Sequence, residues 1–417
     1  MNGFRIKEGE DLSFTVEELV GMYLKHARTL AEKQANTTIK DAVLTIPPYY
    51  RMRERFALYD AMQFAGLTPL AFIHENTAAA LHYGIERKDE NKNHTVIFYN
   101  LGSTSLKVSL VEYSMESSNE KSEKNKKYES FTVLADAWEE NVGGLVFDMN
   151  LANWLADEFD NQPKRAGKKK IRDSPLAMSK LIKEANKAKE ILSANKETSV
   201  YVEAPVDDQD LKATILRSKF EELNQAAFSL LTAPIQKVLD AAGKTISEID
   251  AFEVLGGAVR VPKVQQILQE FVGKNVDVGA HMNGDEAMAM GTSFLAASMS
   301  ASFKTRPIFM NDGLNYPIYA TIRTLGFDDE NDDETEGKDE TTEKFEKNTT
   351  LFPARQKLGS KKALSFTHDK DIKVILFTKN DNGDEEIFTT FHVTKVTAFA
   401  KVIFRSHPTT LTWNLFF

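Results

Sequence analysis

Residues 95–111, with the sequence TVIFYNLGSTSLKVSLV, contain the pattern that decides the fold. The first five residues are β-branched or aromatic, and Leu106 to Val111 alternates apolar with polar side chains, so both segments are predicted to be strands. Between them lies the small-residue turn Leu101-Gly102-Ser103-Thr104-Ser105. Two strands joined by so short a turn predict a β-hairpin rather than a strand-to-helix turn.

The hairpin tip is the first candidate phosphate cradle. Gly102, Ser103 and Thr104 are small enough for backbone amides to approach phosphate oxygens, and the two hydroxyls add donors. A tight hairpin uses Gly and Ser for its turn in any case. The tip alone therefore leaves open whether it is a binding site or only a turn.

Helices and strands alternate on both sides of this hairpin. Thr15 and Glu18 have the spacing of a capping box that begins a helix running to about Ala35. The remaining pattern predicts strands over residues 41–46, 70–73 and 251–255, and helices over 51–65, from 76, over 178–192 and after 262. This alternation predicts an α/β architecture.

Other segments are predicted to lie outside regular structure. We expect solvated loops over Met115 to Lys127 and over the basic stretch Lys164 to Arg172, and a mobile acidic run from Asp328 to Glu346. Short β-prone runs after Leu351 predict a small β-domain, and we place a domain boundary near Thr305 to Pro307.

The composition excludes several classes of function. The formal net charge of -9 argues against nucleic acid as the main partner, since phosphate backbones bind basic surfaces. The absence of cysteine excludes disulfides, thiolate zinc sites and a cysteine nucleophile. No apolar stretch is long enough to span a membrane, and no histidine or carboxylate spacing predicts a protein-held metal. We expect His26, His74 and His82 to be surface or hydrogen-bonded core residues.

A second glycine-bearing turn, Gly256-Gly257-Ala258-Val259-Arg260, follows a predicted strand and precedes a helix. This geometry presents free amides and a helix dipole to an anion, and the Arg260 guanidinium could stack on a purine. The turn lacks the glycine and lysine pattern of a Walker loop and the three glycines of a dinucleotide fingerprint. A close crossing of helix and strand would use the same glycines, so this alternative stays open.

Asn186, Lys189 and Ser193 lie at i, i+3 and i+7 of a predicted helix and so share one face. Such a polar stripe is either a ligand-binding face or simply a solvated one. The helical pattern does not decide between the two.

Seven blocks, in order along the chain, resemble the nucleotide-binding domain of the seventy-kilodalton heat-shock chaperones. They are AVLTIPPYY (42–50), HENTAAA (74–80), NLGST (100–104), GGLVFD (143–148), AKEILS (188–193), VLGGAVRVP (254–262) and NGDEAMAMG (283–291). The stretches EANKAK (184–189), LSAN (192–195), GKNV (273–276) and SFKTRP (302–307) are similar to the large endoplasmic-reticulum branch, the hypoxia up-regulated chaperones.

The resemblance implies a fold class and a domain order. It implies an actin-like ATPase fold with an incomplete first lobe, followed by a partial β-sandwich. The stretch NTTLFP (348–353) resembles the start of the family's β-sandwich domain. We therefore expect a partial nucleotide-binding domain over residues 1–305, a linker with the acidic insert over 306–350, and a partial substrate-binding β-sandwich over 351–417.

The resemblance also implies a nucleotide site for ATP or ADP, with Mg²⁺ left open. It places Gly102, Ser103 and Thr104 at the β- and γ-phosphates, and Gly143 and Gly144 near the ribose and phosphates. Asn186, Lys189 and Ser193 would face the adenosine. Gly256, Gly257 and Arg260 would line the purine site, with Asp285 close to it. No catalytic or metal-ligating residue is assigned.

The chain departs from the family at two hairpin positions. Asn100 and Lys107 stand where the ATPases have aspartates, and Asn186 stands where the smaller chaperones have a glutamate. A neutral amide neither holds the hydration shell of magnesium nor accepts a proton from an attacking water. At a separation of about 4 Å and an effective dielectric constant of roughly 20, losing one carboxylate beside a cation removes about 4 kcal/mol.

The resemblance begins inside the family's domain, so the first phosphate hairpin and the lysine used in hydrolysis are expected to be missing from this chain. Catalysis in this fold needs positioning by both lobes. We therefore expect weak nucleotide binding with little magnesium dependence, and no hydrolysis by the chain alone.

These implications give one main interpretation and two alternatives. The main one is an ATP-binding chaperone that assists protein folding in the endoplasmic reticulum lumen and binds unfolded client polypeptides. The second is a nucleotide-exchange factor for a smaller heat-shock chaperone, and the cytoplasm is the alternative location. A sugar kinase of the same superfold is the third, which the β-prone segment after Leu351 disfavours.

Overall fold

The computed structural model describes residues 4–8, 10–86, 93–117, 127–274, 276, 278–279, 281–300, 302–325, 345–357, 360, 362, 371–394, 403–405 and 414–416. The chain divides into two compact units. The first unit comprises Met1–Ile73, Leu295–Thr305 and Asn311–Phe417, and the second comprises His74–Phe294 and Arg306–Met310. Each unit is described by itself.

The second unit contains the predicted hairpin and both glycine turns. Its helices are α3 (Glu75–Glu86), α4 (Gly144–Asp160), α5 (Pro175–Ala194), α6 (Arg217–Leu223), α7 (Gln225–Phe228), α8 (Ala233–Ala242), α9 (Pro262–Val272) and the first part of α10 (Ala287–Met299). Its strands are β5 (His94–Leu101), β6 (Leu106–Ser117), β7 (Lys127–Glu139), β8 (Glu197–Val206), β9 (Gln209–Leu216), β10 (Ala251–Leu255), β11 (Val278–Gly279) and β12 (Ile308–Asn311). Its short 3₁₀ helices include η2 (Pro163–Arg165), η3 (Ile171–Asp173), η4 (Ile246–Glu248) and η5 (Gly257–Arg260).

The central sheet of this unit has the strand order β11-β10-β5-β6-β7-β12 among the described residues. Strands β5 and β6 pair antiparallel up to Leu101 opposite Leu106, which confirms the predicted hairpin. Strand β10 runs parallel to β5 and ends with Leu255 beside Asn100. The hairpin tip and the double-glycine turn therefore lie at the same end of the sheet.

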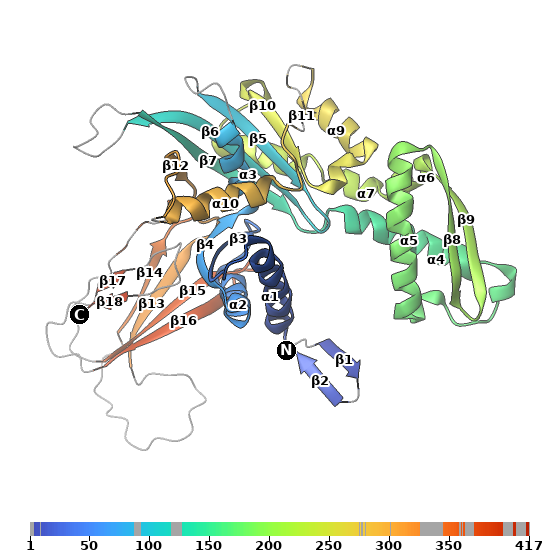
Figure 1. The fold of residues 1–417 in the computed structure, drawn as a ribbon, viewed down its shortest axis with the longest axis horizontal. Helices are drawn as coiled ribbons and strands as arrows, with labels where there is room; N and C mark the ends of the chain where they lie inside the picture. Colours follow the sequence, from blue (N-terminus) through green and yellow to red (C-terminus); the bar gives the residue numbers. More distant parts are fainter. Residues whose placement is uncertain are drawn as a thin grey trace. The chain divides into compact units, whose positions relative to one another are not determined.

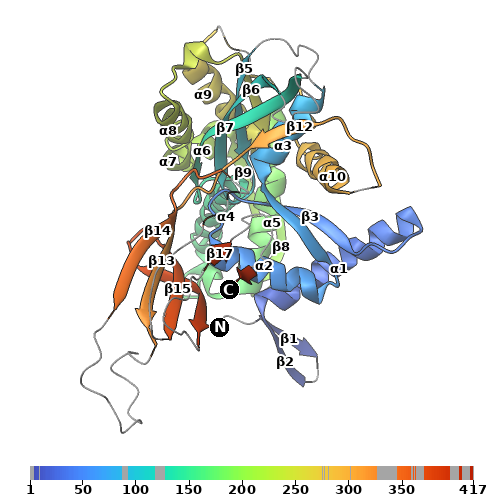
Figure 2. The ribbon, with the colours of Figure 1, turned by 90° about the vertical axis from the view of Figure 1, so that its left-hand side faces the viewer.

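Helices cover both faces of this sheet. Leu106, Val108 and Leu110 of β6 are fully buried in the main core, on the face that α8 covers. Ser109, which alternates with them, faces α3, where its hydroxyl accepts a hydrogen bond from the Asn76 amide at 3.1 Å. Figures 1 and 2 show α3 lying against strands β5 to β7. The mixed α/β architecture predicted from the sequence is confirmed.

Tyr99 joins the hairpin to the helical layer. Its phenol is fully buried and donates a hydrogen bond to the Leu231 carbonyl at 3.2 Å. Burial raises the pKa of the Tyr99 phenol well above its usual value, so the group stays a neutral donor at physiological pH.

Helices α4 and α5 form a further layer with the antiparallel strands β8 and β9, and α5 lies alongside both strands in Figure 1. Phe147 of α4 is fully buried, with its ring 6.4 Å from that of Phe220 and 5.2 Å from that of Phe228. These ring contacts hold α4 against α6 and α7. Helix α4 also packs along α5, and this packing determines which of their side chains share a face.

The first unit contains β1 (Phe4–Glu8), β2 (Glu10–Phe14), α1 (Val16–Ala35), β3 (Asp41–Ile46), α2 (Met52–Phe64), β4 (Thr68–His74, of which His74 opens the second unit), β13 (Ile318–Thr324), β14 (Glu346–Phe352), β15 (Ile372–Lys379), β16 (Glu385–Val393), β17 (Ile403–Arg405) and β18 (Asn414–Phe416). The capping box of α1 is confirmed, because Thr15 and Glu18 each accept a hydrogen bond from the other's backbone amide. A sheet of order β14-β13-β15-β16 packs with α2, whose Phe56 ring lies 6.1 Å from that of Phe388.

The structure corrects three expectations. Strand β6 continues through Ser117 and β7 begins at Lys127, so the ends of the expected loop at 115–127 are strand. Strand β13 lies within residues 306–350, which were expected to be linker and insert.

Residues 118–126 and the acidic residues 328–344 fall outside the described residues, and the predicted domain boundaries remain predictions. Among the described helices, none is both long and apolar enough to cross a bilayer.

The third correction concerns the basic stretch 164–172, which holds η2 and the start of η3 instead of a fully solvated loop. Arg165 is buried with its guanidinium 4.7 Å from the centre of the Phe159 ring. It donates hydrogen bonds to the Asp207 carboxylate and the Lys169 carbonyl. Arg165 is therefore a buried residue that connects these segments through its hydrogen bonds, and the lysines around it form the solvated surface.

We predict that Arg165→Met lowers the free energy of unfolding by about 2 kcal/mol, because it removes the ion pair between the buried Arg165 guanidinium and the partly exposed Asp207 carboxylate. Lys168→Met, on the exposed part of the same loop, should change it by less than about 0.5 kcal/mol. Urea denaturation followed by tryptophan fluorescence measures both, since Trp138 and Trp154 lie in the second unit. Equal effects of the two substitutions would contradict the internal role of Arg165.

Candidate functional site

Four segments of the second unit line one cavity of about 420 Å³. They are the hairpin tip, the start of α4, one face of α5, and the double-glycine turn with η5. The lining residues are Gly102, Ser103, Gly144, Asp148, Asn186, Lys189, Glu190, Ser193, Gly257, Ala258, Arg260 and Val261. The two glycine turns, which are far apart in the sequence, therefore open onto the same space.

The hairpin tip is docked on the N-terminus of α4. The amide of Gly144 donates to the Gly102 carbonyl at 3.0 Å, and the amide of Leu145 donates to the Ser103 carbonyl at 2.8 Å. A Cβ atom at Gly143 would lie 2.4 Å from the Ser103 carbonyl oxygen, so only glycine allows this approach. The first amides of α4 are thus satisfied by the hairpin.

The double-glycine turn approaches the hairpin from the other side. Gly256 has φ of +85°, and a Cβ atom there would lie 2.3 Å from the Leu101 carbonyl oxygen. Gly257, by contrast, has open space around its Cβ position and lines the cavity. Gly256 therefore serves the close crossing of strand and turn, while Gly257 leaves room in the cavity.

Arg260 follows this turn at the rim of the cavity. Its side chain is 71% exposed, and the guanidinium donates to the Asp285 carboxylate at 3.2 Å. An exposed pair of this kind contributes little to stability, so the arginine is free to turn toward a ligand at small cost.

The α5 side of the cavity is organised by Asp148 of α4. Asp148 is 4% exposed, and its carboxylate accepts hydrogen bonds from Asn186 Nδ2 at 2.9 Å and from Lys189 Nζ at 3.0 Å. Lys189 also donates to the Gly144 carbonyl at 3.3 Å. Because the amide nitrogen of Asn186 already donates to Asp148, the Oδ1 atom of Asn186 is the side-chain atom left to accept a hydrogen bond. The Ser193 hydroxyl donates to the Lys189 carbonyl at 3.0 Å.

The structure brings most of the predicted site residues together. Gly102, Ser103, Gly144, Asn186, Lys189, Ser193, Gly257 and Arg260 line the cavity. Gly143, Gly256 and Asp285 stand behind it, in contact with lining residues or next to them, and Thr104 is exposed at the hairpin tip. That these residues bind a nucleotide remains a prediction.

Asp148 and Glu190 also line the cavity and were not predicted as site residues, and neither were Ala258 and Val261. Asp148 stands four positions after Gly144, so helical spacing could have placed it on the same face. Glu190 follows Lys189 directly, and its position on the cavity depends on how α5 packs against α4. The sequence pattern gave no sign of that packing.

The two hairpin substitutions, Asn100 and Lys107, share one partner that the sequence analysis did not identify. Both donate to Oε2 of Glu75, at 3.0 Å from Asn100 Nδ2 and at 2.6 Å from Lys107 Nζ. Glu75 is the first residue of α3, where a negative charge is favoured by the helix dipole.

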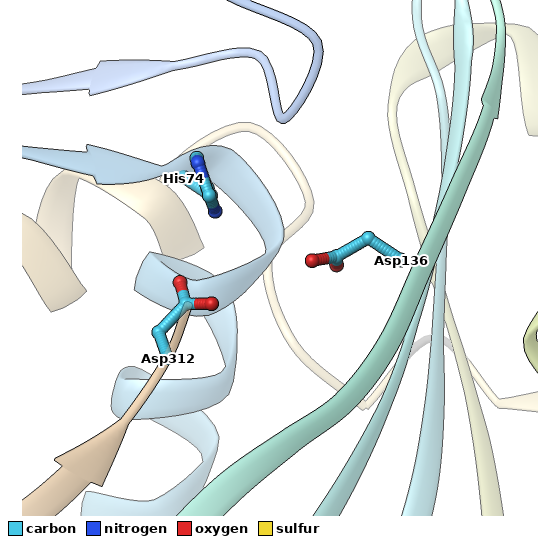
Figure 3. A group of neighbouring side chains, drawn as sticks. All are labelled: His74, Asp136 and Asp312. Atoms are coloured by element: carbon cyan, nitrogen blue, oxygen red, sulfur yellow. The ribbon is translucent and has the colours of Figure 1, made fainter. Parts of the chain in front are cut away.

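Figure 3 shows a histidine and two aspartates: His74 at the end of β4, Asp136 on β7 and Asp312 after β12. His74 is buried, as expected for a core histidine, and Asp136 accepts a hydrogen bond from the Ser109 hydroxyl. His74 and Asp136 belong to the second unit and Asp312 to the first, so we assign no metal site to the three.

Comparison with known proteins identifies the class of protein. The Hsp70 protein family matches residues 3–403, so this chain belongs to the Hsp70 family. The chain is 38% identical to heat shock 70 kDa protein 17 of Arabidopsis thaliana over 375 residues, which cover 90% of this chain and 41% of that protein.

The chain is also similar to hypoxia up-regulated protein 1. It is 38% identical to that of Xenopus tropicalis over 314 residues (75% of this chain and 48% of that protein) and 39% identical to that of Homo sapiens over 309 residues (74% and 30%). The predicted family, and the likeness to its hypoxia up-regulated branch, are confirmed. The chain spans less than half the length of each of these relatives.

We predict that Gly256→Ala lowers the stability of the second unit by about 3 kcal/mol, because the new Cβ meets the Leu101 carbonyl and the residue must keep a positive φ. Gly257→Ala is the matched control and should cost less than about 1 kcal/mol, since its Cβ position is open. Thermal and urea denaturation measure both. If the two alanines destabilised equally, the close crossing at Gly256 would not be a constraint.

Proposed function

We propose that the cavity binds an adenine nucleotide and that this chain carries the nucleotide-binding region of an Hsp70-type chaperone. The observation that supports this most is the convergence of the hairpin tip, the double-glycine turn and the Asn186 face of α5 on one cavity, in a chain of the Hsp70 family. A binding face of this kind needs both small residues that admit phosphates and polar groups that orient a nucleoside.

The charges at the cavity favour weak binding. Lys189 and Arg260 bring two positive charges, while Asp148 and Glu190 bring two negative ones. Lys189 is already paired with Asp148 at 2.9 Å, and Arg260 with Asp285. The lining therefore has no surplus positive charge for a phosphate tail, and binding depends on the nucleoside end.

For the whole protein we propose a chaperone that binds unfolded client polypeptides in the lumen of the endoplasmic reticulum. The likeness to the hypoxia up-regulated proteins supports this location and role. The present chain is not expected to hydrolyse ATP alone, because the hairpin has Asn100 and Lys107 where the resemblance implies aspartates.

A second candidate is a nucleotide-exchange factor for a smaller heat-shock chaperone. The pairing of Glu75 with Lys107 and Asn100 favours it, since a carboxylate held by two donors is poorly placed to accept a proton from water. In that role the nucleotide would be a structural ligand and not a substrate.

Isothermal titration of this chain with ADP tests nucleotide binding. Arg260→Ala should weaken ADP binding by roughly three- to tenfold, the amount expected from loss of a stacked guanidinium. Lys263→Ala removes a partly exposed charge at the second residue of α9, whose side chain donates to Gln266, and should leave the affinity within about twofold. If titration of the wild type with ADP released no heat of binding, the proposed site would be rejected. If the two variants lost ADP affinity equally, the role of Arg260 would be rejected.

Turnover and exchange assays distinguish the two functions. We expect no ATP hydrolysis by this chain above the background of buffer. If exchange is its role, adding it to a smaller Hsp70 loaded with labelled ADP should accelerate release of the label. Measurable turnover that disappears in Glu75→Gln would show that the carboxylate is catalytic after all, against this proposal.

A further inference from the structure

The Glu75–Lys107–Asn100 cluster, defined by these three side chains, lies behind the phosphate hairpin and is not part of the cavity lining. Glu75 is held in place by its neighbour Asn76, which is 1% exposed and donates to the Phe98 and Lys107 carbonyls at 3.3 Å. The start of α3 is thus fixed on β5 and β6, and the Glu75 carboxylate is brought to the base of the hairpin.

Asn100 and Lys107 reach this carboxylate from opposite strands. They are register partners on the two paired strands of the hairpin, one pair before Leu101 and Leu106 at the tip. Their donors meet at the same oxygen, Glu75 Oε2. The Lys107 side chain is 9% exposed and that of Glu75 is 18% exposed, so this ion pair is largely removed from water.

A magnesium ion, which the fold family implies, does not fit this cluster. Magnesium requires near-octahedral oxygen ligands, of which one or two are carboxylates and most are waters or phosphates. The cluster offers a single carboxylate, and one of its oxygens already accepts two hydrogen bonds. The Lys107 ammonium, 2.6 Å from that oxygen, would repel a second cation at the same place.

We propose that the Lys107 ammonium is the resident cation of the phosphate hairpin, so that the chain takes its nucleotide as the metal-free anion. This rests on the proposed nucleotide binding. The cluster adjoins the cavity, because Asn100 Oδ1 lies 3.1 Å from the Cβ position of Gly256 and the next residue, Gly257, lines the cavity. A charge fixed covalently there needs no exchange with solvent metal and is insensitive to chelators.

Binding of Mn²⁺, measured by electron paramagnetic resonance without nucleotide, tests the cluster directly. The wild-type protein should have no Mn²⁺ site at this cluster. K107D, which supplies a second carboxylate beside Glu75, should gain one Mn²⁺ at least about tenfold tighter than any wild-type binding. K107M, which removes the cation without adding a ligand, is the matched control and should gain none. A wild-type affinity equal to that of a folded K107D would overturn the proposal.

Titration of the wild type with ADP, once in excess Mg²⁺ and once in a chelator, provides a test that needs no variant. The two dissociation constants should agree within about twofold. A tenfold or greater tightening by Mg²⁺ would overturn the proposal. If ADP bound in neither buffer, the proposed nucleotide site would fail, while the Mn²⁺ comparison would still decide whether the cluster excludes a divalent metal.

Discussion

The docking of the β5–β6 hairpin on the first amides of α4 is the interaction on which the geometry of the second unit depends. A helix begins with amides that lack partners inside the helix, and here the carbonyls of Gly102 and Ser103 supply them. Because α4 also packs along α5, this contact sets the distance between the hairpin and the polar face of α5. The same hydrogen bonds take the Gly144 and Leu145 amides away from any ligand, so anion contacts must come from elsewhere on the cavity wall.

Local patterns were enough to predict the elements that surround the site. The hairpin follows from two strand-like runs and a small-residue turn, and the start of α1 follows from Thr15 and Glu18. The predictions failed where a partner is distant in sequence. Arg165 was expected in solvent, but its carboxylate partner Asp207 is 42 residues away. Strand β13 was missed because its neighbours β14 and β15 follow a long acidic insert.

The candidate site shows the same division. Its glycine turns and the stripe on α5 could be identified from spacing and family resemblance. The acidic residues that organise them could not, since Asp148 and Asn186 are 38 positions apart and Glu75 and Lys107 are 32 apart. Periodicity places a residue on a face of its own helix or strand, but the packing of two elements decides which faces meet.

The two acidic residues have the same kind of environment. Asp148 is held by a lysine and an asparagine of α5, and Glu75 by a lysine and an asparagine of the hairpin. Each group is electrically neutral with donors matched to a single carboxylate, which is how a partly buried charge avoids the penalty of isolation. The hairpin is thus flanked by two preorganised polar networks.

The first unit is assembled from residues 1–73 together with residues beyond 294, whereas the second unit is almost continuous from 74 to 294. During synthesis the ribosome therefore releases all strands of the β5–β10 sheet before the β13–β16 sheet exists. Helix α2 shares a core with that later sheet, so its apolar residues in that core lack their packing partners until the sheet has been synthesised. The first unit therefore completes its packing only after the strands of the second unit's sheet have been synthesised.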